Sequence, residues 1–341
     1  MSEILAPCGA MESLTAAVNA GADAVYLGEE YFSARKNADN FTAEQLCDAV
    51  RFCHYSGVKV YVTLNTLVFD REIPLLAKAI ENCAKADVDA FIVQDMGVAR
   101  LARQIVPELP LHASTQMTVN SPEGAIMAKE LGFTRVVLGR ELSLAQIKAI
   151  TESCDIETEL FVHGALCVCI SGQCYMSSVL GGRSGNRGLC AQPCRLDFTS
   201  GDRHNVLSLK DLSLTEKLPE LAKAGITSFK IEGRMKRPEY VAGAVNACRV
   251  ALDGGTPDLI SLKNVFSRSG FTSGYFDDDF KNMQGVRTKD DVTSATSKVL
   301  SAMKQYYHKP FRRFPADITV NVKSGQPVCY KLSACGVSSS A

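Results

Sequence analysis

The 341-residue chain lacks several features that would assign it to a class at once. It has no excess charge of either sign, with 37 basic and 37 acidic residues, so no overall attraction to nucleic acid, membranes or acidic proteins is expected. No apolar run approaches the roughly 20 residues that a membrane-spanning helix needs. An expected strand at Ile4–Ala6 leaves no room for a signal peptide. We therefore expect a cytoplasmic protein without membrane association, in which any charged partner is bound by a local patch.

The sequence also lacks the motifs of well-understood hydrolases. It contains no recognisable Ser-His-Asp arrangement, no HExxH helix and no paired aspartates of a known motif. A glycine-rich segment, residues 181–188, resembles a phosphate-binding loop. It lacks the Lys-Ser/Thr pair and the strand-to-helix context of a P-loop. The chemistry must therefore be sought elsewhere in the chain.

What the sequence does contain is a regular alternation of strand-like and helical segments. Eight short runs are mostly β-branched or aromatic and are bounded by turn or polar residues. They span residues 4–6, 24–28, 59–65, 90–95, 111–116, 135–140, 157–164 and 228–234. Capping boxes at Thr42, Ser143 and Ser213 predict helix starts between them. Strands joined by helix-sized connections pair in parallel, so an α/β fold is expected.

A weak internal repeat favours closure of the sheet into a barrel. Residues 20–28, 86–94, 131–139 and 224–232 each read as a helix end, a tight turn and a buried strand. They lead into the second, fourth, sixth and eighth strands, and alternate strands of a β/α barrel fill the same interior layers. A similar pattern also occurs in open α/β sheets. We predict an eight-stranded parallel β/α (TIM-like) barrel over residues 1–255.

One connection of the predicted barrel is about twice as long as most others. It joins the seventh strand to the eighth and contains a cysteine-rich insertion, residues 165–205. Because connections after barrel strands meet at the C-terminal face, the insertion is expected to lie over the barrel mouth. A helix is expected from Arg237 to about Leu252, followed by a mixed extension over residues 256–314. Residues 315–341 read as the start of a truncated β domain, since two strands make no stable domain.

The cysteines of the insertion are the strongest chemical signal. Of the 13 cysteines, five lie between positions 167 and 194. Four of them, Cys167, Cys174, Cys190 and Cys194, supply a thiolate set that suits a 4Fe–4S cluster or a structural zinc. Their spacing matches neither zinc ribbons nor bacterial ferredoxins, so spacing alone leaves both metals open. Cys169 is expected to be a buried non-ligand. The alternative is that all five are small buried hydrophobic residues.

Polar residues follow the ends of the expected strands. Arginine binds carboxylate or phosphate through its planar fork, so convergent arginines at the mouth indicate an anionic substrate. For each one, the alternative is a solvated surface charge. The expected substrate-binding set is Arg35, Asn65, Gln116, Arg140, Arg183, Arg187 and Arg234. Candidates for a general acid or base are His163, Glu232 and Asp95, although a strand-end histidine such as His163 is often only a hydrogen-bonded structural residue.

The cysteine motif and several other segments resemble one known family. The motif is Glu159-x-Phe161-x2-Gly164-Ala-Leu-Cys167-x4-Gly172-x-Cys174-x-Met176-Ser177, and it resembles the diagnostic pattern of the collagenase-like peptidase family. The resemblance extends to LAPCG at 5–9, GADAVYLG at 21–28, FSARKNADNFT at 32–42, KVYVTLNTL at 59–67, HASTQM at 112–117, GGRSGNRGLCAQPCR at 181–195 and KIEGRMK at 230–236. The chain departs from many members in having Cys169 and in ending within what resembles their C-terminal β region.

The resemblance implies two different activities. Members first received a protease label without agreed catalytic residues, whereas others act in hydroxylation of a pyrimidine in tRNA or rRNA. It implies a 4Fe–4S cluster on the same four cysteines and prephenate as the oxygen source. Arg140 and Arg234 would then hold prephenate's carboxylates, and basic residues of the insertion and of residues 304–313 would contact RNA phosphates. A collagenase-like peptidase and a zinc-stabilised binding module are the alternatives.

Overall fold

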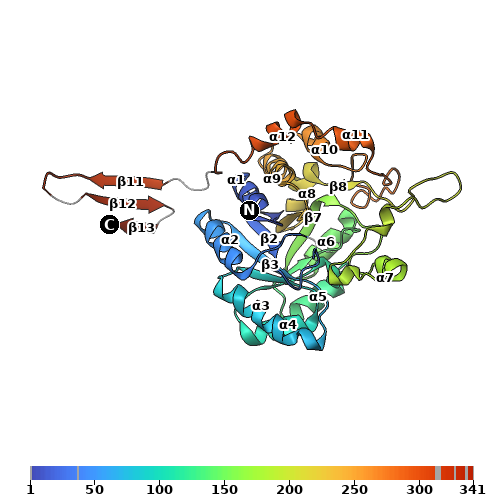
Figure 1. The fold of residues 1–341 in the computed structure, drawn as a ribbon, viewed down its shortest axis with the longest axis horizontal. Coiled ribbons are helices and arrows are strands. Elements are labelled where there is room, and N and C mark those ends of the chain that lie inside the picture. Colours follow the sequence, from blue (N-terminus) through green and yellow to red (C-terminus); the bar gives the residue numbers. More distant parts are fainter. Residues whose placement is uncertain (1, 37, 312–315, 326–327, 335–336, 341) are drawn as a thin grey trace.

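The computed structural model describes residues 2–36, 38–311, 316–325, 328–334 and 337–340. Eight parallel strands form a closed barrel, because the last barrel strand pairs with both the first and the seventh. The barrel strands are β1 (Glu3–Pro7), β2 (Ala24–Gly28), β3 (Lys59–Leu64), β4 (Ala90–Val93), β5 (Leu111–Ala113), β6 (Arg135–Val137), β7 (Glu157–Ala165) and β9 (Ser228–Ile231). Figure 1 shows the helices arranged around this barrel. The predicted TIM-like fold is confirmed.

Helices cover the outside of the barrel and follow its strands in turn. They are α1 (Met11–Asn19), α2 (Ala43–Tyr55), α3 (Ile73–Lys85), α4 (Met96–Ile105), α5 (Pro122–Glu130), α6 (Leu144–Ser153), α8 (Leu218–Lys223) and α9 (Pro238–Leu252). The capping boxes predicted at Thr42 and Ser143 are confirmed. The one predicted at Ser213 is wrong. Ser213 ends a strand, its hydroxyl contacts Thr215 and His163, and α8 begins only at Leu218.

Two short strands extend the barrel beyond the predicted eight. Strand β8 (Asp211–Ser213) pairs antiparallel with the end of β7, and β10 (Phe271–Thr272) pairs with β8. The extension also contains α10 (Leu259–Val265), α11 (Lys289–Thr293) and α12 (Ser297–Lys304). Both α10 and α12 pack on α9, where a Cβ at Gly243 would come within 2.7 Å of the Met303 sulfur. The extension is therefore built onto the outside of the barrel.

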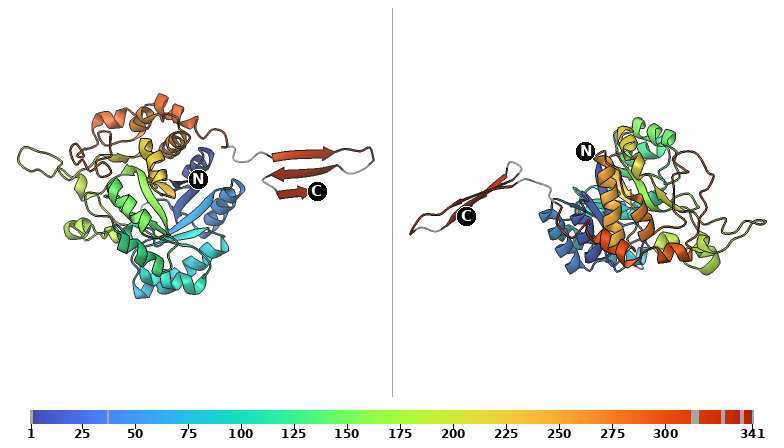
Figure 2. Two further views of the ribbon diagram at one scale, coloured as in Figure 1. Left: turned by 180° about the vertical axis from the view of Figure 1, so that it is seen from behind. Right: turned by 90° about the horizontal axis from the view of Figure 1, so that it is seen from above.

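The strands at the end of the chain form a separate antiparallel sheet. It consists of β11 (Ala316–Asn321), β12 (Cys329–Ala334) and β13 (Val337–Ser340). The predicted strands beginning near Asp317 and Val328 correspond to β11 and β12. Both views in Figure 2 place this sheet away from the barrel. Within the described residues, no helix is long and apolar enough to cross a membrane.

The barrel interior contains charged residues below its mouth. Glu159 on β7 is fully buried, and it accepts hydrogen bonds from Lys230 Nζ at 2.6 Å and from Arg135 Nη1 at 3.1 Å. Arg135 Nη1 also donates to Glu3 at 2.7 Å. Burial alone would raise the pKa of Glu159, but Lys230 and Arg135 more than offset it and lower the pKa. Paired in this way, the buried charges avoid the large cost of an isolated ion and form a rigid floor for the mouth.

Candidate active site at the barrel mouth

Three arginines from different strand ends surround one carboxylate at the mouth. Arg35 follows β2, and its Nη2 donates to Glu232 Oε1 at 2.9 Å. Arg234 follows β9 and is 6% exposed. Arg140 follows β6 and stands near enough to Glu232 to lower its pKa. The barrel topology thus brings three of the predicted substrate-binding residues to one place.

The buried guanidinium of Arg234 is held by hydroxyl groups. Its Nη1 donates to Ser33 Oγ at 2.5 Å and to Thr63 Oγ1 at 2.9 Å. Burial is the main cause that lowers the pKa of Arg234, to about 10, so the group is still a cation at neutral pH. Its Cζ lies 5.8 Å from the ring centroid of Tyr26. The two hydroxyls accept its hydrogen bonds and the aromatic ring lies near it, but none of these groups neutralises its charge.

Glu232 is ionised in this setting. Burial raises its pKa, but the arginines outweigh this effect and bring the pKa down to about 2. Arg35 contributes most to that lowering, followed by Arg140 and Arg234. The mouth therefore combines three cationic groups with one carboxylate, which leaves positive charge for an anionic ligand.

Arg140 connects the mouth to the cysteine-rich insertion. Its Nη2 donates to Cys167 Sγ at 3.0 Å, and its Nη1 donates to the carbonyl of Ala165 at 2.8 Å. Its Cζ lies 5.3 Å from the ring centroid of Phe161. The buried Nε of Arg140 has no hydrogen-bond partner among the described residues. One guanidinium thus contacts a cysteine sulfur and still has a free donor.

The insertion lies over the mouth, as predicted, and two glycines allow it to approach the barrel loops closely. Gly172 has a φ of +80°, and a Cβ there would stand 2.3 Å from the carbonyl oxygen of Gln116, after β5. Gly188 has a φ of +77°, and a Cβ there would stand 2.5 Å from the carbonyl oxygen of Ser33, after β2. Since only glycine adopts such backbone angles freely and leaves this space, both positions fix the insertion against the barrel.

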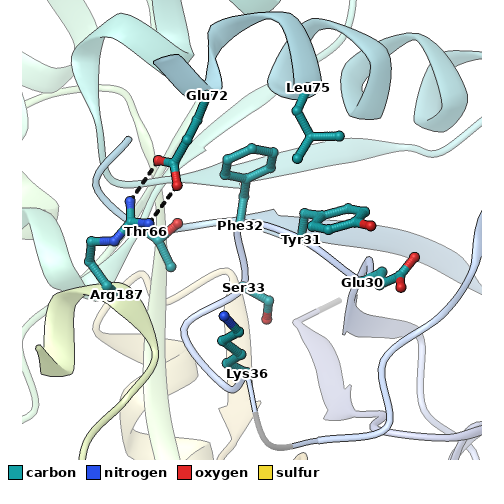
Figure 3. A pocket seen from close by; sticks show the side chains of 9 residues that line it. All are labelled: Glu30, Tyr31, Phe32, Ser33, Lys36, Thr66, Glu72, Leu75 and Arg187. Atoms are coloured by element: carbon teal, nitrogen blue, oxygen red, sulfur yellow. Dashed lines mark hydrogen bonds and ion pairs between the residues drawn. The ribbon is translucent and has the colours of Figure 1, made fainter. Parts of the chain in front are cut away.

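Arg187 fastens the insertion to the loop after β3. Its guanidinium forms a two-bond pair with Glu72, at 2.7 and 2.8 Å, and its Nη1 also donates to the carbonyl of Leu67 at 2.6 Å. Figure 3 shows this pair at the edge of a small cavity of about 90 Å³. The hydrogen bond from Arg187 is the main cause that lowers the pKa of Glu72 to about 2. Arg187 was predicted to bind substrate, but the structure commits its fork to this anchor.

The cysteines of the insertion lie within electrostatic reach of one another. Burial is the main cause that raises the pKa of the Cys194 thiol, and Cys167, Cys190 and Cys174 raise it further. The Ser177 hydroxyl and the backbone N–H of Gln192 both donate to Cys190 Sγ, at 3.9 and 3.4 Å. In the described part of the chain, no three His, Cys, Asp or Glu side chains are grouped closely enough to hold a single metal ion.

Cys169 is only half-buried, so the expectation of full burial is wrong. Its thiol takes part in a hydrogen bond with Cys174. Of the cysteines outside the insertion, Cys8, Cys53, Cys83 and Cys248 are buried in the core, whereas Cys47 and Cys154 are half-buried. The insertion therefore carries five thiols, and Cys169 contacts Cys174, one of the four predicted ligands.

The remaining predicted site residues have structural contacts. Asp95 caps α4 by accepting from the N–H groups of Gly97 and Val98, and it also accepts from the N–H of Val68. The side-chain oxygen of Asn65 accepts from the N–H of Ala34 at 3.0 Å. Arg183 Nε donates to the carbonyl of Leu189 within the insertion. The Gln116 N–H donates to Ser114 Oγ.

His163 is sealed beneath β8 and β10. It is 1% exposed, and burial lowers its pKa to about 4, so its ring is neutral at pH 7. Its Nδ1 lies 3.4 Å from Ser213 Oγ, while its Nε2 has no partner among the described residues. Of the three acid–base candidates, Glu232 is the one that lies among the arginines of the mouth.

Sequence reasoning missed the hydroxyls and rings that shape the mouth. Ser33 and Thr63 hold Arg234, and Tyr26 and Phe161 lie beneath the arginines. Tyr26 and Phe161 could have been found from the sequence, because every second residue of a barrel strand such as β2 or β7 faces inward. The position of Ser33 in an irregular loop had no such signal.

The fold and the site together define a β/α-barrel protein with a cysteine-rich insertion over an arginine-lined mouth. The family model of Peptidase family U32 matches residues 9–284, so the chain belongs to that family. It is 43% identical to a 23S rRNA 5-hydroxycytidine synthase of Escherichia coli K12, over 80% of this chain and 42% of that protein. It is 38% identical to tRNA hydroxylation protein P1 of Bacillus subtilis, over 75% of this chain and 64% of that protein.

A further relative has a different name. The chain is 36% identical to a collagenase of Porphyromonas gingivalis, over 80% of this chain and 71% of that protein. The chain spans less than two thirds of the length of each RNA-modifying relative named above. The family membership is therefore shown, whereas the names of its members point to two activities.

Proposed function

We propose that this protein takes part in the oxygen-independent hydroxylation of a pyrimidine in tRNA or rRNA, in the cytoplasm. In this proposal prephenate is the oxygen source and a 4Fe–4S cluster is the cofactor. The observation that carries it is the contact of Arg140 with both Cys167 and the mouth. It places a thiol of the insertion beside a set of cations suited to a small dianion. The names of two relatives with 43% and 38% identity support RNA as the substrate.

The cysteine set offers the number and kind of ligands that a 4Fe–4S cluster takes. Cys167, Cys174, Cys190 and Cys194 supply four sulfurs on one insertion, and two of them accept hydrogen bonds from neighbouring donors. Hydrogen bonds to the sulfurs are one of the features that tune a protein-bound iron–sulfur cluster. When bound, such a cluster would supply redox chemistry at the mouth.

The mouth suits a dicarboxylate because it has more positive than negative charges. Arg35, Arg140 and Arg234 face one acid, Glu232, which is already ionised. Arg140 has an unpartnered buried Nε, and Arg35 is 35% exposed at its side chain, so both can still donate to a ligand. A charge-assisted hydrogen bond contributes about 1.5–3 kcal/mol when the alternative is an unsatisfied donor. Prephenate carries two carboxylates and would match this arrangement.

RNA would approach over the insertion and the barrel rim. A base must leave its stack to reach a buried site, and flanking phosphates are then bound by basic groups nearby. Arg183 on the insertion is exposed, as is Lys304 at the end of α12. Arg312 and Arg313, which were also expected to contact phosphates, lie outside the described residues.

Proteolysis has one contact in its favour, and the geometry weighs against it. His163 lies near the hydroxyl of Ser213, as in a serine nucleophile with its base. However, among the described residues no carboxylate orients the other ring nitrogen. The ring is also buried, and its pKa of about 4 makes it a weak base. A zinc-stabilised binding module would leave the mouth arginines without a role.

The proposal is tested by nucleoside analysis of the host's RNA. Deletion of the gene should remove one hydroxylated pyrimidine from digested tRNA or rRNA, as read by mass spectrometry. Wild-type protein and Cys169→Ser should restore it, whereas Cys190→Ala should not. A strain unable to make prephenate should lose the same nucleoside. An unchanged nucleoside profile after deletion overturns the proposal, and cleavage of gelatin by the purified protein would favour the peptidase.

A further inference from the structure

A second basic cluster lies beside the mouth, where the extension meets the loop after β9. Three cations surround one aromatic ring, that of Phe266. Lys236 Nζ lies 2.9 Å from the ring centroid, Arg287 Cζ lies 4.4 Å from it, and Arg268 Cζ lies 5.4 Å from it. We name Lys236, Phe266, Arg268 and Arg287 the Phe266 cluster. Its members come from the loop after β9 and from the extension near α10 and β10.

The cluster has more positive than negative charge. Asp211 is its acid, and it accepts a hydrogen bond from Arg268 Nη1. Among the residues that the structure describes, neither Lys236 nor Arg287 forms an ion pair or a side-chain hydrogen bond. Contacts between cations and a ring stabilise by about 0.5–2 kcal/mol each, but they leave the charges in place. Arg287 is therefore left for an anion from outside, and so is Lys236 in its ammonium form, which a bound anion would favour.

Buried polar atoms without partners lie in the same region. Asp211 is 2% exposed and its Oδ2 has no hydrogen-bond partner, and Ser267 is fully buried with an unpartnered hydroxyl, both within the described part of the chain. Nearly all buried polar groups in folded proteins are hydrogen-bonded. The Ser267 hydroxyl can donate to an anion, whereas Asp211 Oδ2 only accepts and needs a donor or a cation such as Lys236. The pKa of Lys236 is lowered to about 7, mainly by burial and then by Arg268, which is consistent with crowded cations.

The cluster is open to solvent on one side. Arg287 is exposed and Lys236 is partly exposed, while Arg268 is mostly buried. Side-chain exposure therefore falls from Arg287 to Arg268. A ligand entering from solvent would meet the unpaired Arg287 first and the paired Arg268 last. Lys236 stands only four residues after Glu232, so the cluster adjoins the mouth along the chain.

We propose that the Phe266 cluster is a binding site for a phosphate group. Phosphate oxygens accept charge-assisted hydrogen bonds from arginine and lysine, and the cluster offers one of each without an ion pair. The phosphate could belong to an RNA backbone or to a small phosphate ester. An RNA source rests on the proposed function: with its target base in the mouth, the backbone would pass over Lys236, and phosphate contacts position RNA without reading its sequence.

The test measures binding of inorganic phosphate, by calorimetry at constant ionic strength, to the full chain. Arg287→Gln and Lys236→Gln should each weaken binding about tenfold, since each removes a charge-assisted hydrogen bond. Lys281→Gln, an exposed lysine of the same extension, is the matched control and should bind as wild type does. Arg287 is exposed, so its variant is expected to fold even where Lys236→Gln does not.

A second arm separates the two sources of phosphate. If the phosphate belongs to RNA, binding of a short single-stranded RNA should depend less steeply on salt in Arg287→Gln and Lys236→Gln than in the wild type. The slope should be smaller by about 0.7 for each phosphate contact removed. Weaker phosphate binding with an unchanged RNA slope supports the site with a small phosphate ester as its ligand. Phosphate binding that is absent in the wild type, or equal in wild type and both variants, overturns the site. The nucleoside profile of the deletion strain tests the proposed function separately from this site.

Discussion

Replacing Glu232 by glutamine removes the negative charge at the centre of the mouth and so measures its contribution to stability. The side chain keeps its shape but cannot ionise, and Arg35 loses its ion-pair partner at 2.9 Å. The pKa of Glu232 is about 2 instead of 4.5, and each pKa unit corresponds to about 1.4 kcal/mol. Because the group is mostly buried, we expect Glu232→Gln to lower the free energy of unfolding by about 3 kcal/mol at pH 7.

The pH dependence gives the sign of this effect. A depressed folded-state pKa stabilises the fold above the unfolded pKa of about 4.5, and the contribution is lost as the pH falls towards 2. The difference between wild type and Glu232→Gln should therefore shrink to about 1.5 kcal/mol at pH 3. Urea unfolding at a series of pH values measures it, with Glu81→Gln on the exposed face of α3 as control. A difference below about 1 kcal/mol at pH 7, or one that is constant with pH, would refute the reasoning.

Three further predictions concern the floor, the insertion and its link to the mouth. Lys230→Met leaves Glu159 with one cation fewer, and loss of a buried ion-pair partner should cost about 3–5 kcal/mol in urea unfolding; a cost below about 1 kcal/mol contradicts the buried network. Gly188→Ala should cost about 1–3 kcal/mol and speed tryptic cleavage of the insertion, because its φ is positive and its Cβ would strike backbone; Gly181→Ala, where a Cβ meets nothing within 4 Å, should do neither. Arg140→Gln removes a donor to a cysteine sulfur and should lower the reduction potential of the proposed 4Fe–4S cluster in a redox titration. An unchanged potential would count against that contact.

The sequence was sufficient for the barrel because the signals are local and repeated. Each strand is a short apolar run, and most connections have the helix-sized length that a parallel crossover needs. The same topology also determines which strand-end residues meet. For this reason Arg35, Arg140 and Arg234 were predicted together and are found together. Once the barrel is predicted, the residues that directly follow its strands can be placed as well.

Residues in the insertion did not follow such a rule. Arg187 was grouped with the mouth arginines, but the conformation of the insertion places it against Glu72. Strand β8 escaped prediction because three residues carry no period, and its pairing with β7 sealed His163 from solvent. The buried network had a readable signal, since Glu159 and Lys230 interrupt apolar strands. Its pairing required the register between β7 and β9.

The cluster on the insertion is the central claim, and metal analysis of anaerobically purified protein tests it most directly. The account predicts equal amounts of iron and sulfide, about four of each per chain, with little zinc. Cys190→Ala should lose both, whereas Cys169→Ser should keep them. A colourless protein with one zinc per chain and no sulfide, or iron that survives Cys190→Ala, would contradict the account.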